Sequence, residues 1–310
     1  MNRGQAPYAI GLDVGGTKIA GGVVALDSGQ VLAQRRIPTQ AGRGGEAVLA
    51  DAIALAEGLC ADAEGLGVGV YAIGVGVPEL VDLAGAITSG HAIAWRGMPV
   101  RERFSRLGPS VIESDVRAHA LAEARFGAGR AFSLFVFVTV GTGISCCLVQ
   151  DGVPYAGARG NALILASSPL TTTCTTCGTL LRPVLEEFAS GPALVTRYNQ
   201  IGAGRVARGE EVLAAASAGD QAAVKIVATA GEALGASVGW LINVLDPEAV
   251  IVGGGLGTTG GLYWDSFVAA TRAHVWADTS REIPIRMAAL GPDAGLVGAA
   301  VAAGAASSRV

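Results

Sequence analysis

Three short glycine-rich turns combine residue types that bind phosphate groups. They are "DVGGTK" at 13–18, "VGTGIS" at 140–145 and "VGGGLG" at 252–257. Glycine lets backbone N–H groups approach an anion closely, and a threonine hydroxyl beside it adds another donor. One such turn alone is more often an ordinary tight turn. Three of them, two with threonine between or after the glycines, favour a nucleotide-binding site.

The first turn is not a P-loop. It does not follow the G-x-x-x-x-G-K-[ST] pattern, and no helical pattern begins directly after it. What remains is a hairpin in which the N–H groups of Gly15 and Gly16 and the Thr17 hydroxyl face an anion. Lys18 could contact the same phosphate, but an ordinary surface lysine is an equal alternative.

Cys174 and Cys177 form a second pattern with possible chemistry, a C-x-x-C pair in a threonine-rich loop. The pair could bind a metal, form a redox couple or be the remnant of a lost site. A structural zinc needs four Cys or His ligands, and a thioredoxin-like context is absent. The histidines lie far away in sequence, so we expect them on the surface or in the core: His91, His119 and His274. We therefore expect no structural zinc.

Composition indicates a compact α/β protein. Of 310 residues, 51% are hydrophobic and 46 are glycine. Two lysines, twenty arginines and a net charge of −4 provide no basic face for nucleic acid. No apolar signal segment opens the chain and the Ala- and Gly-rich tail is too weakly apolar for a membrane span, so we expect a cytoplasmic protein. Its five cysteines should be reduced, with Cys146 and Cys147 buried in a strand.

The elements expected around the turns suggest a duplicated core. We predict strands over 8–26, 72–77, 132–149 and before the third turn, helices over 45–61 and 116–126, and mainly helix after 178. Asp115 stands directly before the second of these helices, where it could simply be an N-cap. Two strand-turn-strand units about 125 residues apart carry the same glycine chemistry. They suggest two α/β halves with a cleft between them.

The ordered set of motifs resembles one family. The motifs are "DVGGTK", "GVGVP", "ESDVRAHALAEARFGAGR", "VTVGTGIS", "LEEFASG" and "NVLDPEAVIVGGGLG". Together they resemble the ROK family of sugar kinases and repressors in the actin-like ATPase superfamily, from Ile10 to about Ala302. The resemblance implies an α/β fold with two actin-like ATPase (ribonuclease H-like) domains and an interdomain cleft. It places 1–116 with 293–310 in the N-terminal domain and 117–292 in the C-terminal domain.

The resemblance also implies ATP and Mg²⁺ as cofactors. Phosphate contacts are expected from Gly15, Gly16, Thr17, Lys18, Gly141, Thr142 and Gly143, and contacts near the adenosine from Gly254 and Gly255. Asp13 matches the family acid that orients Mg²⁺ through water. Asp115 falls on the catalytic aspartate, which accepts the proton of the sugar hydroxyl as its oxygen attacks the γ-phosphate. Ser114 stands where the family usually has a sugar-binding asparagine.

On the sugar side this chain departs from the family pattern. Alignment from Gly157 puts Ile164 at the position of a sugar-binding glutamate and Ser167 at that of a histidine that also ligates zinc. The last family cysteine falls near Arg182. Isoleucine has no polar atom and serine is a poor zinc ligand. We therefore expect a degenerate loop in which the apolar replacements provide packing instead of ligands.

Some acceptor contacts survive in this comparison. Glu186 aligns with the second sugar-binding glutamate, with Glu187 as the fallback and an exposed helix residue as the equal alternative. His91 and Trp95 fall in the segment that borders the sugar, although Trp95 is more typical of packing.

These features predict an ATP-dependent kinase for a primary hydroxyl of a modified hexose, such as the aminosugar kanosamine, or of a cyclitol. The alternatives are a non-catalytic sugar sensor, which the intact Asp13, Asp115 and glycine turns disfavour, and a pseudokinase. The expected partner is the small-molecule substrate, with neither nucleic acid nor membrane. A homodimer is expected from the family.

Overall fold

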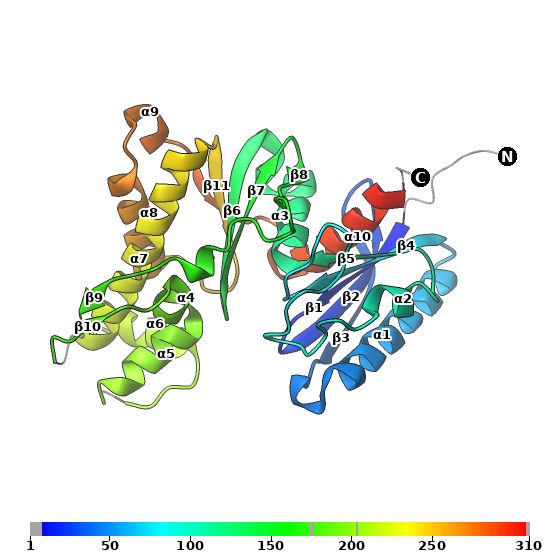
Figure 1. The fold of residues 1–310 in the computed structure, drawn as a ribbon, viewed down its shortest axis with the longest axis horizontal. Coiled ribbons are helices and arrows are strands. Elements are labelled where there is room, and N and C mark those ends of the chain that lie inside the picture. Colours follow the sequence, from blue (N-terminus) through cyan, green and yellow to red (C-terminus); the bar gives the residue numbers. More distant parts are fainter. Residues whose placement is uncertain (1–7, 174–176, 203, 308–310) are drawn as a thin grey trace. The chain divides into compact units, whose positions relative to one another are not determined.

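The computed structural model describes residues 8–173, 177–202 and 204–307 (Figure 1). The chain divides into two compact units. The first comprises Met1–Ala131, Val149–Ala162 and Ala289–Val310, and the second Phe132–Leu148 and Leu163–Ala288.

The first unit is built on a five-stranded sheet of order β3-β2-β1-β4-β5. Its strands are β1 (Tyr8–Val14), β2 (Lys18–Ala25), β3 (Val31–Pro38), β4 (Val70–Val77) and β5 (Ser110–Ser114). Strands β1, β2 and β3 pair antiparallel, whereas β4 runs parallel to both β1 and β5. Its helices are α1 (Gly45–Gly65), α2 (Val100–Phe104), α3 (Asp115–Phe126) and α10 (Ala294–Ser307), with 3-10 turns at Ala41–Arg43, Ala128–Ala131 and Gly291–Asp293.

Alternating residues of β1 serve two different cores. Ile10 and Leu12 pack in the cluster that includes the apolar face of α1, whereas Ala9 belongs to the cluster that includes Leu296 of α10. Successive side chains of a strand point to opposite faces of the sheet. The two helices therefore cover different faces of the same sheet.

Helix α10 approaches this sheet so closely that glycine is required at the contact points. A Cβ atom on Gly11 of β1 would lie 1.8 Å from the carbonyl oxygen of Leu296, and one on Gly74 of β4 would lie 1.8 Å from that of Ala299. On α10 itself, a Cβ atom on Gly298 would lie 1.7 Å from the carbonyl oxygen of Ala118 in the neighbouring helix α3. The C-terminal helix is thus seated on the strands that carry the first glycine turn.

The second unit contains most of a sheet of order β12-β11-β6-β7-β8. Its strands are β6 (Leu134–Val140), β7 (Ile144–Gln150), β8 (Val153–Pro154), β11 (Ala249–Gly253) and β12 (Ile285–Met287), with β9 (Thr172–Thr173) and β10 (Leu180–Leu181) as a separate pair. Its helices are α4 (Leu185–Ala189), α5 (Gly191–Gln200), α6 (Gly209–Ser217), α7 (Gln221–Leu245), α8 (Gly261–His274) and α9 (Asp278–Arg281), with a 3-10 turn at Leu165–Ser167.

Helix α7 is the central helix of the second unit. Gly231, Gly235 and Gly239 recur every fourth residue and leave room for backbone carbonyl oxygens of α8. In the described part of the chain, α7 alone is long and apolar enough to cross a membrane, and half of its apolar window is buried. Its contacts with α8 show a core helix.

The predicted elements are confirmed, with small shifts at their ends. Helix α1 continues to Gly65 and β4 begins at Val70, while the strand-turn-strand units appear as β1–β2 and β6–β7. The division into units differs from the predicted boundary at 116 and 117, because α3 stays in the first unit. Its close contact with α10 at Gly298 accounts for this.

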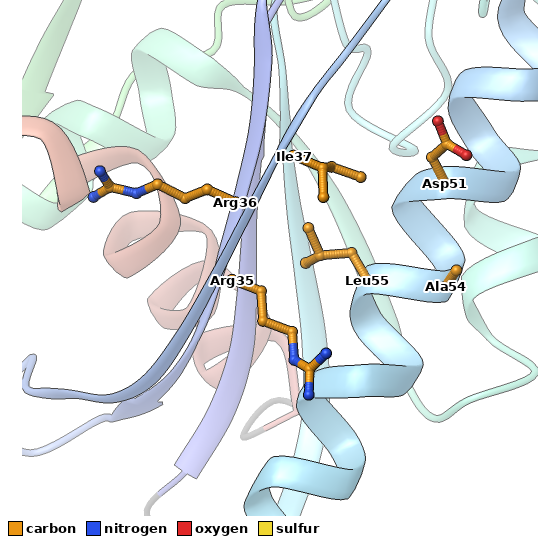
Figure 2. A pocket seen from close by; sticks show the side chains of 6 residues that line it. All are labelled: Arg35, Arg36, Ile37, Asp51, Ala54 and Leu55. Atoms are coloured by element: carbon orange, nitrogen blue, oxygen red, sulfur yellow. The ribbon is translucent and has the colours of Figure 1, made fainter.

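A surface hollow of about 500 Å³ lies beside β3 and α1 in the first unit (Figure 2). Its lining residues are Arg35, Arg36, Ile37, Asp51, Ala54 and Leu55. Arg35 pairs with Asp62 at 2.7 Å, and Arg36 extends away from Ile37 to pair with Asp293 at 2.7 Å. None of the predicted site residues lines this hollow.

Because α10 packs so closely on the glycines of the sheet, the effect of a Gly→Ala substitution on stability should depend strongly on which glycine is replaced. Gly74→Ala should lower the free energy of unfolding by at least about 3 kcal/mol, because the new methyl group would overlap backbone that cannot rotate away. Urea denaturation monitored by circular dichroism measures this. Gly65→Ala, with no atom within 4 Å of the new methyl group, is the control and should not destabilise. Equal effects of the two substitutions would contradict the packing argument.

Candidate functional site

The buried residue Thr39 fixes the backbone of the first glycine turn through two hydrogen bonds. The Gly15 N–H donates to the Lys18 carbonyl at 2.9 Å and closes the hairpin between β1 and β2. The Thr39 hydroxyl donates to the Gly15 carbonyl at 2.6 Å, and the Thr39 N–H donates to the Thr17 carbonyl at 2.9 Å. Gly16, Thr17 and Lys18 are exposed at the tip. Backbone donors at an exposed, fixed tip are suited to bind phosphate oxygens.

Asp13, at the end of β1, lies beside His119 of α3. A Cβ atom on Gly295, in the first turn of α10, would lie 2.7 Å from Asp13 Oδ2 and 2.7 Å from His119 Cε1. Gly295 therefore lets the first turn of α10 pack closely against both side chains. His119 Nδ1 is also 2.8 Å from the Asp115 carbonyl oxygen. His119 was expected to be an ordinary surface or core residue, so its place beside Asp13 was not predicted. Its spacing of four residues from Asp115 on a helix could have indicated that the two residues lie on the same helix face.

Asp115 carries a carboxyl group with a strongly shifted pKa. Burial is the main cause and raises the pKa from 3.8 to about 6. The His119 ring acts in the opposite direction, Asp13 and Glu79 raise the pKa further, and the Val116 N–H, which donates to Oδ1 at 2.6 Å, lowers it. Ser114 rather than Asp115 occupies the N-cap position of α3, and it makes no capping hydrogen bond. Asp115 is instead the first residue of α3, and its carboxylate accepts one N–H of the first turn, that of Val116.

Ser114 presents an unsatisfied polar atom next to this carboxylate. It is 6% exposed. Among the described residues, its Oγ is the only buried side-chain nitrogen or oxygen without a hydrogen-bond partner. Buried hydroxyl groups are normally paired, so this one is suited to receive a hydrogen bond from, or donate one to, a bound molecule.

The second and third glycine turns lie side by side in the second unit. Gly254 has a φ of +83°, and a Cβ atom on it would lie 2.3 Å from the Val140 carbonyl oxygen. The same oxygen accepts hydrogen bonds from the N–H groups of Leu256 and Gly257 at 3.0 and 3.1 Å. The predicted residues Gly141, Thr142, Gly143, Gly254 and Gly255 are thereby brought to one end of β6 and β11.

Two further glycines join this arrangement. The Gly191 N–H, at the start of α5, donates to the Gly141 carbonyl at 2.9 Å. A Cβ atom on Gly209, at the start of α6, would lie 3.2 Å from Gly191 Cα. Gly191 closes the motif "LEEFASG", and its neighbours Ser190, the N-cap, and Pro192 are typical of a helix start. Gly209 belongs to none of the motifs found in the sequence. The N-terminus of α5 thus adjoins the second turn, and that of α6 adjoins Gly191.

Glu186 contacts the second glycine turn directly. Its Oε2 accepts a hydrogen bond from the Ile144 N–H at 2.8 Å, and a Cβ atom on Gly143 would lie 2.7 Å from the same oxygen. Glu187, the fallback, is exposed and accepts from the Val184 N–H at 3.1 Å at the start of α4. Of the two neighbours, Glu186 is therefore placed beside the candidate phosphate-binding turn.

The loop that carries the altered family positions differs from the expected packing. Leu165 is buried, but Ile164 is 46% exposed, so Ile164 does not provide the predicted packing. The Ser167 hydroxyl donates to the Ile164 carbonyl at 2.9 Å. A short 3-10 turn begins at Leu165, directly after Ile164, and of these two neighbours only Leu165 is buried.

The cysteines of this loop are described only in part. Cys174 lies outside the described residues, and the exposed Cys177 has its Sγ 3.2 Å from Thr179 Oγ1. Within the described ranges, no three His, Cys, Asp or Glu residues are grouped so as to hold a metal ion. The predicted burial of Cys146 and Cys147 is confirmed, and burial raises the pKa of the Cys146 thiol to about 12.

The raised pKa of Asp115 predicts a pH-dependent effect on stability. Because the folded-state pKa lies above the unfolded one, ionisation of Asp115 destabilises the fold as the pH rises from about 4 to about 6. Asp115→Asn should therefore raise the free energy of unfolding above pH 7, by on the order of 2 kcal/mol. The gain should vanish below about pH 4.

Denaturation curves at several pH values measure this effect. Asp62→Asn is the control, since the Arg35 guanidinium holds the pKa of the Asp62 carboxyl below its usual range, so the control should give no such gain. If Asp115→Asn raised the free energy of unfolding equally at all pH values, the raised pKa of Asp115 would be contradicted.

Comparisons with known proteins agree with the motifs. The model of the ROK family matches residues 9–305. A glucokinase of Streptomyces coelicolor is 32% identical, covering 94% of this chain and 96% of its own. The ROK hexokinase of Thermus thermophilus superposes with a TM-score of 0.82 at 31% identity, covering 98% of this chain and 100% of its own.

A second solved structure is similar to the same extent. The ROK family glucokinase of Streptomyces griseus, solved in complex with glucose and AMPPNP, gives a TM-score of 0.80 at 30% identity, with coverage of 96% and 99%. The predicted α/β fold class of two actin-like ATPase domains is confirmed by these neighbours. With the family motifs in order along the chain and the match spanning nearly its whole length, this protein belongs to the ROK family.

Proposed function

We propose that this ROK-family enzyme, an ATP-dependent sugar kinase, transfers the γ-phosphoryl group of ATP to a primary hydroxyl of a hexose-like acceptor. The observation that carries the proposal is Asp115: a carboxylate with a pKa of about 6, near Asp13 and next to the unpaired Ser114 hydroxyl. A general base works best when its pKa lies near the working pH. A carboxylate with a pKa near 6 is mostly ionised at pH 7 and still holds a proton more tightly than an ordinary aspartate.

In the proposed reaction, Asp115 accepts the proton of the acceptor hydroxyl as that oxygen attacks the γ-phosphorus. The new bond joins this oxygen to phosphorus, and the bond from phosphorus to the β–γ bridging oxygen breaks to release ADP. Positioning and charge stabilisation provide most of the catalysis in phosphoryl transfer. The proposed contribution of Asp115 is proton removal at the correct moment.

We propose that the glycine turns bind the nucleotide. The exposed tip of the first turn supplies the donors of Gly16 and Thr17 for the terminal phosphates, with Lys18 adding a positive charge. Gly15, whose N–H closes the hairpin on the Lys18 carbonyl, contributes close approach of the backbone instead of a donor. In the second unit, Thr142 and Gly143 supply corresponding donors, while the Gly141 N–H donates to the Gly143 carbonyl and shapes the turn. Gly254 and Gly255 lie near the adenosine in this proposal. The fixed backbone around each turn supports it, because donors that are already in place need no reordering when an anion binds.

Asp13 is the proposed anchor for Mg²⁺. Mg²⁺ keeps several waters and is commonly bound through one or two carboxylates together with substrate phosphates. The position of Asp13, only partly buried and two residues before Gly15 of the first glycine turn, supports this role. Bound there, Mg²⁺ would supply positive charge to the phosphate oxygens.

The acceptor is proposed to be a modified sugar, an aminosugar such as kanosamine, or a cyclitol. Ser114 reaches less far than the asparagine common in the family and can grip fewer hydroxyl groups. Ile164 and Ser167 replace a carboxylate and an imidazole, and Ile164 keeps an exposed apolar side chain. A substrate that lacks or replaces ring hydroxyls suits this reduced set, with His91 and Glu186 as the proposed remaining contacts.

A cytoplasmic homodimer is proposed as the working form. Three large apolar side chains of the second unit support it: Trp240, Val244 and Trp276 are 62%, 56% and 90% exposed. The Trp276 N–H donates to Asn243 Oδ1 at 2.8 Å, so the three side chains gather at the C-terminal end of α7. Exposed apolar groups of this size commonly mark interfaces.

The kinase proposal is tested by coupled ADP release with Mg²⁺-ATP. The panel contains glucose, mannose, fructose, N-acetylated hexosamines, kanosamine and C7-cyclitols. One modified acceptor should be turned over, and Asp115→Asn should lower kcat by roughly 10²- to 10⁴-fold while ATP binding is retained. The exposed Asp62→Asn is the control and should keep full activity. Measurable ATP binding without turnover of any acceptor would favour a pseudokinase or sensor.

The homodimer proposal is tested by sedimentation. Trp276→Glu combined with Trp240→Glu should convert a dimer to a folded monomer, because two charges would be buried in an apolar contact. Leu83→Glu, at an apolar residue of the first unit that is 65% exposed, is the control and should leave the dimer intact. A dimer that survives the double substitution would place the interface elsewhere.

A further inference from the structure

We propose that Glu79 is a positioning residue for the phosphoryl acceptor, holding the loop of residues 89–93 in the place where it borders the acceptor. The inference rests on the proposed function and adds to it a residue that sets acceptor affinity. Strand β4 ends at Val77, and Glu79 comes directly after the motif "GVGVP", which ends at Pro78.

The Glu79 carboxylate is saturated by donors from one loop. Its Oε2 accepts from the Ser89 hydroxyl and from the His91 N–H at 2.9 Å. Its Oε1 accepts from the N–H groups of Ala92 at 2.7 Å and Ile93 at 2.9 Å. Three consecutive backbone N–H groups thus converge on one carboxylate, which is the arrangement of an anion-binding nest. The loop conformation depends on this internal anion.

The charge of this carboxylate is retained despite its burial. Glu79 is 5% exposed. Burial alone would raise the pKa of Glu79, but the hydrogen bonds from Ser89 and from the three backbone N–H groups bring it below its usual range. Glu79 is therefore an anion at neutral pH, and an anion binds N–H donors more strongly than a neutral acceptor does.

The same loop is anchored at its far end. Ile93 and Trp95 are buried, and the Trp95 indole N–H donates to the Gly45 carbonyl at 2.8 Å. The exposed residues between the two anchors are Gly90, His91, Ala92 and Ala94. Glu79 and Trp95 therefore fix a short exposed segment from both sides.

This exposed segment lies next to the proposed reaction site. Ala92 Cβ is 3.8 Å from the position of a Cβ atom on Gly16, in the first glycine turn. The Glu79 charge is close enough to Asp115 to contribute to the raised pKa of that carboxyl. The loop therefore adjoins the turn proposed for the donor phosphates, and its anchor adjoins the proposed base. A molecule whose hydroxyl reaches Asp115 would meet His91 and Ala92.

Glu79→Gln separates this role from a general contribution to stability. The amide keeps the size of the side chain, but its NH₂ group cannot accept hydrogen bonds. It would face N–H donors that one carboxylate oxygen now binds, so part of the nest is lost. The amides of His91, Ala92 and Ile93 should exchange with deuterium at least about tenfold faster. For the acceptor found in the panel, KM should rise about tenfold or more, whereas KM for ATP should stay within about twofold. Ser89→Ala removes one of the four donors and should give a smaller change of the same kind.

Asp82→Asn is the matched control. The Asp82 carboxylate also accepts two backbone N–H bonds, from Ala84 at 2.9 Å and Ala86 at 2.8 Å, in the neighbouring turn. It should leave exchange at 91–93 and both KM values unchanged. If Glu79→Gln does not fold, Ser89→Ala decides by the same measurements.

Two results would overturn the inference. Unchanged exchange at 91–93 would show that Glu79 does not hold the loop. Faster exchange with equal changes in both KM values would show a structural role alone. Absence of turnover by the unaltered protein is a different failure, since it would remove the proposed function and the acceptor role together, while exchange would still decide whether Glu79 fixes the loop.

Discussion

The contact between α10 and the first sheet is the constraint on which the site in the first unit depends. The helix backbone lies so close to β1 and β4 that Gly11 and Gly74 have no room for a side chain. This contact brings the C-terminal segment back to β1, which carries Asp13 and leads into the first glycine turn. It also places Gly295 beside Asp13, where the side chain of any larger residue would collide with the carboxylate. Packing and chemistry are therefore fixed by the same close approach.

A second constraint is the concentration of carboxylates around the end of β5. Asp13 and Glu79 both raise the pKa of Asp115, in addition to the effect of burial. The two neighbouring carboxylates have different surroundings: Glu79 accepts four hydrogen bonds, whereas Asp13 lies beside His119. The fold thus spends stability to keep Asp115 as a stronger base than an ordinary aspartate. Such groups, with a shifted pKa and a specific partner, are typical of functional sites.

Much of the fold and part of the site could be predicted from the sequence, because these signals are local. Strand patterns, glycine turns and the strand-to-helix junction at Asp115 depend on neighbouring residues. Thr39 and Glu79 were beyond such reasoning, since each acts through groups at least ten residues away in the chain. Glu186 was expected from the family motif, but its hydrogen bond from the Ile144 N–H, 42 residues away, was not. The exposure of Ile164 was mispredicted for a related reason. Whether an apolar loop residue is covered depends on tertiary packing that no local pattern encodes.

In the proposed reaction, this chain phosphorylates a primary hydroxyl of a small acceptor with Asp115 as base. The most direct measurement is a proton-coupled ³¹P NMR spectrum of the protein incubated with Mg²⁺-ATP and the acceptor. We expect the resonances of ADP together with a new phosphomonoester signal split into a triplet, because a phosphate on a CH₂–O group couples to two protons. Both should be nearly absent with Asp115→Asn. Release of inorganic phosphate alone, a doublet from a secondary position, or an unchanged ATP spectrum would contradict the proposed reaction.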